Sequence, residues 1–127
     1  MITQTERSEV TVTLPLPSSK LHPNGRCHWA VKAKLTKSHR LLARTEASFQ
    51  TGGYEPMWQS VTVEYRAYFK VRRTRDQEGI ISVNKAYMDG ICDAKLIAND
   101  SGVTFLPVTI AIDRSNPRLE IIVRHQA

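Results

Sequence analysis

The sequence predicts a single α+β domain in which one mixed sheet is covered by two helices. Its 127 residues suit one domain, and a content of 41% hydrophobic and 24% charged residues is typical of a globular protein. Segments with alternating apolar residues occur near both ends and in the middle, and two long helix-like segments lie between them. We therefore expect one domain over residues 1–127 with the element order β-α-β-α-β-β.

The first strand and the first helix have clear boundaries. In residues 9–17, EVTVTLPLP, the side chains of Val10, Val12 and Leu14 share one face, and the prolines end the strand. The Pro, Ser, Asn and Gly content of residues 17–26 indicates a loop. Residues 28–50 lack Gly and Pro, which favours a helix, and TGGYEP then ends it.

Three further segments are expected to be strands. Residues 60–71, SVTVEYRAYFKV, alternate, with Val61, Val63, Tyr65, Ala67 and Phe69 on one face. Residues 103–113 and 118–125 are also rich in β-branched residues, and the turn RSNP joins them.

Residues 78–95 predict an amphipathic helix. On a wheel of about 100° per residue, its apolar side chains gather on one face: Ile80, Ile81, Val83, Tyr87, Met88, Ile91 and Ala94. The opposite stripe carries Glu78, Lys85 and Asp89, with Asp93 beside it. This stripe can be a solvated face with a Lys85–Asp89 pair at i, i+4, or part of a functional site.

The distribution of charge predicts a polyanionic partner. The formal net charge is +6, and residues 20–44 hold seven Lys and Arg but no Asp or Glu. A second basic group covers residues 66–75. Clustered positive charge is typical of nucleic-acid binding, whereas a merely solubilising surface usually mixes both signs.

Two carboxylates follow the second basic group directly. Asp76 and Glu78 are two residues apart, so their side chains can point the same way in an extended stretch. Carboxylates about 4 Å apart repel by roughly 4 kcal/mol at an effective dielectric near 20, and a divalent cation removes that penalty. Asp100, in the turn ANDSG after the second helix, is a further candidate ligand for Mg²⁺.

Two stretches together carry a family resemblance. LPLPSSKLHPNGRCHWAVKAKLTKSHR and RRTRDQEGIISVNKAYMDGICDAKLIANDSGV resemble the RusA family of Holliday junction resolvases, in particular its phage and prophage members. The family signature is an acid pair, an Asn, a helix with a Lys and an Asp, and an acidic loop. By position these fall on Asp76 and Glu78, on Lys85 and Asp89, and on Asp100. Glu78, Gly79 and Asn99 stand where the family usually has Asp, Asn and a second Asp.

The resemblance implies a metal-dependent nuclease that resolves Holliday junctions by paired, symmetric phosphodiester nicks. Asp76, Glu78 and Asp100 would hold Mg²⁺, with Mn²⁺ able to substitute, and Lys85 would act on the scissile phosphate with Asp89 as its orienting partner. A homodimer is implied because the junction has two symmetric strands to cut. The residues expected to hold the DNA backbone are Lys20, Arg26, Lys32, Lys34, Lys37, Arg72, Arg73 and Arg75.

Other interpretations remain open at the level of sequence. The chain could be a relative that binds branched DNA without cutting, a sheet-based RNA binder, or an assembly subunit of a mobile element. Trp29 and Trp58 could stack on a base or sugar, although we expect core or interface packing for both.

Cysteine usage and hydropathy predict a cytoplasmic protein, and the family resemblance implies that its cell is a bacterium or a phage-infected host. Cys27 and Cys92 lack metal-ligand spacing and suit free thiols in a reducing compartment. No run of about eighteen apolar residues predicts a membrane span, and the polar N-terminus does not resemble a secretory signal.

Overall fold

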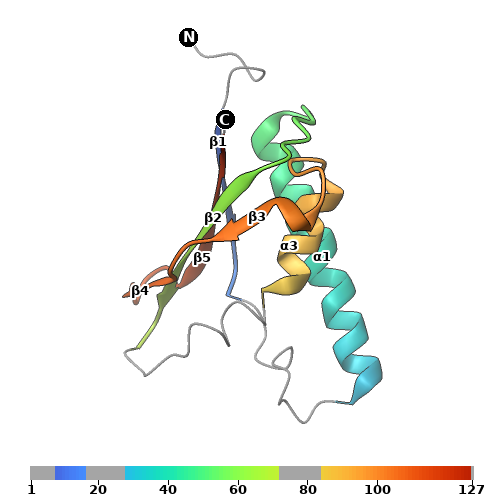
Figure 1. The fold of residues 1–127 in the computed structure, drawn as a ribbon. Coiled ribbons are helices and arrows are strands. Elements are labelled where there is room, and N and C mark those ends of the chain that lie inside the picture. Colours follow the sequence, from blue (N-terminus) through green and yellow to red (C-terminus); the bar gives the residue numbers. More distant parts are fainter. Residues whose placement is uncertain (1–7, 17–27, 72–83, 127) are drawn as a thin grey trace.

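The structure is a computed structural model that describes residues 8–16, 28–71 and 84–126. In chain order its elements are β1 (Glu9–Leu14), α1 (Trp29–Thr51), β2 (Val61–Phe69), α3 (Lys85–Asp93), the short 3-10 helix η3 (Asp100–Gly102), β3 (Val103–Phe105), β4 (Thr109–Ile112) and β5 (Arg118–His125). The fold is α+β, with two helices on one side of a single five-stranded sheet (Figure 1). The predicted fold class and its mixed sheet are confirmed.

The sheet is mixed because β2 has parallel as well as antiparallel neighbours. Its strand order is β1-β5-β2-β3, and β4 also pairs with β2. The β1–β5 and β5–β2 pairs are antiparallel, whereas β3 and β4 run parallel to β2. A parallel return requires a crossover, which α3 provides, and Figure 1 shows α3 beside α1 on the same face of the sheet.

The strand alternation seen in the sequence selects the covered face. Val10, Val12 and Leu14 of β1 are buried while the residues between them are exposed. The same period buries Val61, Val63, Tyr65 and Ala67 of β2. These faces form a single core with α3 and β5 whose largest fully buried side chains include Tyr65, Tyr87, Leu14, Ile91, Leu96, Ile97, Leu119 and Ile121.

The strand predicted at residues 103–113 is two strands, because one extra residue interrupts its pairing with β2. Val63 pairs with Phe105 and Arg66 pairs with Thr109, so three steps along β2 face four steps along its partner. Pro107 lies in this interruption and has no N–H to donate to a ladder. The extra residue reverses the alternation, so that Ile110 and Ile112 lie opposite Ala67 and Phe69.

Local capping interactions determine where helix α1 begins and ends. The Nδ1 atom of His28 accepts a hydrogen bond of 3.2 Å from the backbone N–H of Ala30, which caps the first turn. Gly52 takes a left-handed conformation with φ of 65° and closes the last turn. The helix therefore covers the predicted range to within a residue.

The two helices approach each other closely at Gly90. A Cβ atom placed on this residue would lie 2.1 Å from the backbone oxygen of Arg40 and 2.8 Å from the Cβ of Ala43. Only a residue without a side chain permits this separation, so Gly90 determines how closely α3 packs on α1.

Helix α3 is shorter than the predicted 78–95 at its C-terminal end. It ends at Asp93, and Lys95 has a φ of 67° that no helix continues. The chain then joins the sheet: Ile97 forms a parallel bridge with Trp58, whose N–H donates to Leu96 O at 2.8 Å. Residues 78–83 of the prediction lie outside the described residues.

Among the helices of the described ranges, none is long and apolar enough to cross a membrane.

Candidate nucleic-acid interface

On the uncovered face of the sheet, arginines and acids compensate each other. Glu64 accepts hydrogen bonds from Arg66 at 2.9 Å and from Arg124 at 3.0 Å, and Arg124 also pairs with Glu9 at 2.7 Å. These hydrogen bonds, led by that from Arg66, hold the pKa of Glu64 below its ordinary value. Because its charges are paired, this face offers little net positive charge to a polyanion.

A second ion-pair group lies at the other end of β5. The guanidinium of Arg118 contacts Asp113 at 2.8 Å and Glu120 at 3.2 Å, and it also lies over the ring of Tyr68, with its Cζ 3.9 Å from the ring centroid. Tyr68 lies on this face of β2, since it alternates with the buried Tyr65 and Ala67. Its ring is engaged by Arg118, so the sheet does not present it as a stacking platform for RNA.

The basic residues of α1 differ sharply from those of the sheet. Among the described residues, none of the following has an acidic partner within ion-pair distance: Lys32, Lys34, Lys37 and Arg44. The helix itself contains a single acid, Glu46. Three of these residues are among the predicted DNA-binding residues, and the structure places them together on one long helix at the surface.

Arg40 is the exception on α1, because it joins the two helices. Its Nε and Nη2 atoms donate to the two carboxylate oxygens of Asp93 at 2.5 Å and 2.9 Å. The pair raises the pKa of Arg40 and lowers that of Asp93, the hydrogen bond between them being the main cause of both. Asp93 belonged to the polar side of the predicted second helix. The partner on α1 could not be recognised from spacing along one helix.

Lys85 and Asp89 lie where the helical wheel placed them. Both are on α3, the Lys85 Nζ lies 3.4 Å from the Asp89 Oδ1, and the lysine side chain is 73% exposed. The predicted i, i+4 pair is confirmed, and its lysine is accessible to a ligand. The function assigned to the pair stays a prediction.

Beneath α3 lies a buried hydroxyl that the sequence did not single out. Tyr65 is 1% exposed, and its Oη has no hydrogen-bond partner within the described part of the chain. Burial, followed by the negative charge of Asp89, raises the pKa of this phenol. The alternation of β2 predicts that Tyr65 is buried, but not that its hydroxyl ends near Asp89.

Asp100 lies close to the first residues of β2. It opens η3, and the next element, β3, starts at Val103 opposite Val61, the first residue of the parallel strand β2. A Cβ on Gly102 would meet Gln59 O at 1.9 Å, so η3 lies directly against the chain that enters β2. Only the backbone position of Asp100 is described.

The remaining predicted site residues lie outside the described residues. They are the acids Asp76 and Glu78 and the cations Lys20, Arg26, Arg72, Arg73 and Arg75. Residues 72–83 follow the C-terminal end of β2. That end, at Phe69, is eight residues or about 26 Å along the strand from Val61, the end near Asp100. Within residues 8–16, 28–71 and 84–126, no three His, Cys, Asp or Glu side chains could hold a metal ion together. The Mg²⁺ site of Asp76, Glu78 and Asp100 therefore stays a prediction.

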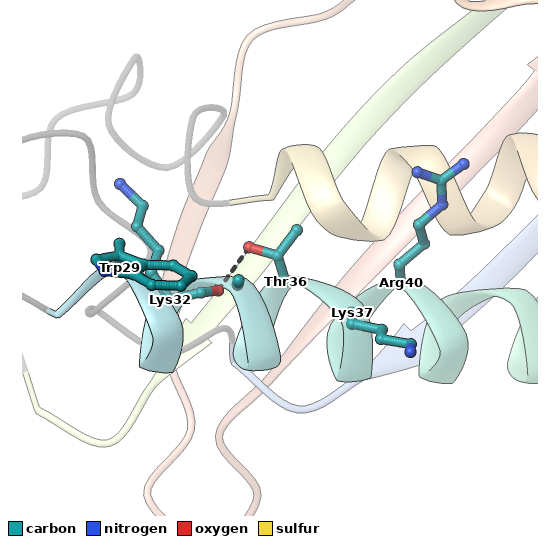
Figure 2. A pocket seen from close by; sticks show the side chains of 6 residues that line it. Trp29, Lys32, Thr36, Lys37 and Arg40 are labelled. Atoms are coloured by element: carbon teal, nitrogen blue, oxygen red, sulfur yellow. Dashed lines mark hydrogen bonds between the residues drawn. The ribbon is translucent and has the colours of Figure 1, made fainter.

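The two tryptophans differ in their environment. Trp58 is 8% exposed and belongs to the core, so the expected core packing is confirmed for it. Its ring stacks on that of His125, with centroids 5.4 Å apart. Trp29 is 76% exposed at the start of α1, so it does not pack in the core, and its packing in an interface stays a prediction. Trp29 lines an open hollow of about 510 Å³ with five other residues of the same helix (Figure 2): Lys32, Ala33, Thr36, Lys37 and Arg40.

Comparison with known proteins gives one clear relative. No protein-family model matches the sequence. A protein of Xylella fastidiosa (strain Temecula1 / ATCC 700964), described as "Uncharacterized protein", is 32% identical over 121 residues, which cover 91% of this chain and 69% of the Xylella protein. The crystal structure of the periplasmic domain of Helicobacter pylori MotB aligns with 94% of this chain and 78% of that domain, with 14% sequence identity and a TM-score of 0.42. At the identity and coverage of the Xylella match, the chain belongs to the same protein family as the Xylella fastidiosa protein.

Proposed function

We propose that this protein binds branched DNA and cleaves it as a structure-selective, Mg²⁺-dependent endodeoxyribonuclease of the RusA type. The observation that carries the DNA-binding part is the contrast between the sheet and α1. The sheet's arginines are paired with acids, whereas Lys32, Lys34 and Lys37 have no acidic partner among the described residues. Uncompensated cations on one helix release counterions when they contact phosphates, which favours binding to a polyanion.

The exposed lysine of α3 supports the catalytic part. Lys85 extends into solvent from the start of the helix, and Asp89 holds it from one turn away. An ammonium group in this position can neutralise charge that develops on a phosphate. We assign Lys85 this role and Asp89 the role of positioning it.

The metal would be bound by carboxylates that have no arginine partner. The described carboxylates Glu64, Asp93 and Asp113 are each tied to arginine, so they do not suit a cation. Asp76, Glu78 and Asp100 are the acids that the family resemblance assigns to Mg²⁺. When bound, Mg²⁺ would supply an activated water and stabilise charge on the phosphodiester.

A second function has a specific observation in its favour. Asp100 lies beside the start of β2, while the segment with Asp76 and Glu78 follows the end of that strand. A site made of all three acids requires the chain to return along the sheet. A protein in which these acids stay apart would bind branched DNA without cutting it.

The proposal includes the compartment and the oligomer. Two cysteines without metal-ligand spacing and a DNA substrate suit the cytoplasm of a bacterium or of a phage-infected cell. Paired, symmetric nicks suit a homodimer with twofold symmetry, which brings one site to each of two equivalent strands.

A labelled synthetic four-way junction tests binding and cleavage separately. We expect binding that weakens steeply with salt, and symmetric nicks with Mg²⁺ but not with EDTA. The triple variant Lys32→Ala/Lys34→Ala/Lys37→Ala should lower the slope of log affinity against log salt by up to about 2.7, or about 0.9 per phosphate contact. Arg114→Ala, which removes an exposed charge at the turn before β5, should leave that slope nearly unchanged.

The nuclease assignment depends on two further variants. Asp100→Asn and Lys85→Ala should each lower the nicking rate by at least about a hundredfold while the junction still binds, since each removes stabilisation of the transition state. Binding without nicks at any Mg²⁺ or Mn²⁺ concentration would leave the non-catalytic function. If no junction binds even at low salt, both functions are refuted.

A further inference from the structure

The hollow on α1 combines an aromatic ring with positive charge on one face of a helix. Its residues are spaced so that the helical period brings them together, and Figure 2 shows Trp29 and Lys32 at one end and Lys37 and Arg40 at the other. From Trp29 to Arg40 the helix rises roughly 16 Å, at 1.5 Å per residue. That length matches a few nucleotides of a strand and is too short for a large partner surface.

The exposed ring of Trp29 is held in place on one side. His28 stacks against it, with ring centroids 5.6 Å apart and an interplanar angle of 30°. The same histidine caps the helix through the N–H of Ala30, so ring and helix end are fixed together. A large aromatic side chain that is 76% exposed yet held in place offers a platform for a flat ligand.

The other residues of the hollow shape its floor and its charge. Ala33 is small, which makes room beside Trp29, and the Thr36 hydroxyl donates to Lys32 O at 2.9 Å and so lies against the helix. Arg40 is tied to Asp93, so it contributes little net charge. Lys32 and Lys37 have no ion-pair partner among the described residues and supply the positive charge on either side of Thr36.

We propose that this hollow binds a short unpaired stretch of a DNA strand, with one base stacked on Trp29 and neighbouring phosphates on Lys32 and Lys37. Aromatic platforms between cations are the usual means of holding single strands, because every unpaired base has a free face. The bases of a continuous duplex are stacked on each other and cannot use the ring. The inference rests on the proposed DNA binding and specifies which part of a branched substrate α1 would hold.

Tryptophan fluorescence tests the inference directly, since the chain has two tryptophans and only Trp29 is accessible. The probe is an oligothymidylate of about 10 nucleotides, within the length that single-strand binders usually cover. We expect it to quench the emission of the parent protein at low salt and to leave the emission of Trp29→Phe unchanged.

Affinity measurements with the same labelled oligonucleotide separate stacking from charge. Trp29→Ala should bind about tenfold more weakly with an unchanged salt slope, and Trp29→Phe should recover most of that loss. Lys37→Ala should lower the single-strand salt slope by about 0.7. The matched controls Tyr54→Ala, an exposed aromatic beyond the other end of α1, and Arg114→Ala should bind like the parent.

The outcomes distinguish this inference from the proposed function. If DNA binds but Trp29 is not quenched and Trp29→Ala keeps the parent's affinity, the hollow is not the strand site, while the proposed function stands. Equal quenching by a blunt duplex of the same length would also overturn the inference. If neither the oligonucleotide nor the four-way junction binds, the inference and the proposed function fail together.

Discussion

At the scale of single residues, the structure explains why one set of cations is available to a ligand and another is not. Arg66, Arg118 and Arg124 each contact an acid on a neighbouring position of the sheet. Arg40 contacts Asp93 across the two helices. The remaining lysines of α1 face solvent with no such neighbour among the described residues, so the net charge of the described surface is concentrated there.

The Arg40–Asp93 pair predicts a pH dependence of stability. The pKa of Asp93 is lowered from 3.8, chiefly by the hydrogen bond from Arg40. A lowered pKa means that the carboxylate stabilises the fold above its unfolded pKa, and that this contribution is lost as pH falls through the folded pKa. Asp93→Asn should therefore unfold at lower urea concentration than the parent at pH 7.

Urea titrations at several pH values provide the measurement. The difference in unfolding free energy between parent and Asp93→Asn should shrink as pH falls below about 4, where the parent's carboxylate takes up a proton. The difference in unfolding free energy between the parent and Arg40→Ala should shrink over the same pH range. A difference that stays constant from pH 7 to pH 2 would contradict a stabilising ion pair.

At the scale of elements, Gly90 decides the packing of the two helices. Helix propensity alone favours alanine over glycine by about 1 kcal/mol in a helix interior. Against this, the new Cβ would lie within 2.1 Å of Arg40 O, a backbone atom that cannot rotate away. The two effects have opposite signs, so one substitution tells which of them dominates.

We expect Gly90→Ala to destabilise the protein by about 1–3 kcal/mol, because α3 must shift away from α1 to make room. The measurement is the free energy of unfolding in urea, followed by circular dichroism. A stabilisation of about 1 kcal/mol, as propensity predicts, would instead show that the helices are further apart than described.

The elements also show how far sequence patterns reach. Alternation predicted β1 and β2 well, because each strand has one buried face and its period of two is visible in the sequence. The interruption within residues 103–113 was missed, although Pro107 inside a strand pattern is a signal of one. That the interruption adds one residue shows only in the pairing with β2.

The candidate site was predictable in part for a similar reason. Spacing within one helix is sufficient to pair Lys85 with Asp89, and a run without acids is sufficient to identify α1 as basic. Contacts between elements, such as that of Arg40 with Asp93, depend on tertiary packing. Trp29 was expected in a core or interface because tryptophan is usually highly buried; what decides its exposure is that α1 is buried only at Ala43, Ala47 and Thr51, in its C-terminal half.

At the scale of the whole molecule, α1 has two faces that can serve different partners. The hollow with Trp29 lies on one face. A second face carries apolar side chains that are exposed to different degrees: Val31, Leu41, Leu42 and Phe49, of which Leu41 and Phe49 are 61% and 77% exposed. We refer to these four residues as the outer stripe of α1, and we propose that two copies of the chain form a homodimer through it.

Substitutions in the outer stripe should dissociate the dimer. Leu41→Glu and Phe49→Glu each place a charge in the proposed contact, which an interface core does not tolerate unpaired. We expect the parent to sediment as a dimer and both variants as monomers, with unchanged circular dichroism. Thr13→Glu, which adds the same charge to an exposed position of β1, is the control. A parent that sediments as a monomer at every concentration, or dimers that survive both variants, would refute this contact surface.

The interruption at Pro107 has a consequence for how the edge of the sheet can vary. Removing one residue between Phe105 and Thr109 would give an uninterrupted register in which Ile110 and Ile112 still lie opposite Ala67 and Phe69. An exchange of Leu106 for another aliphatic residue changes no orientation at all. This connection can therefore lose one residue and still present the same side chains of β4 opposite β2.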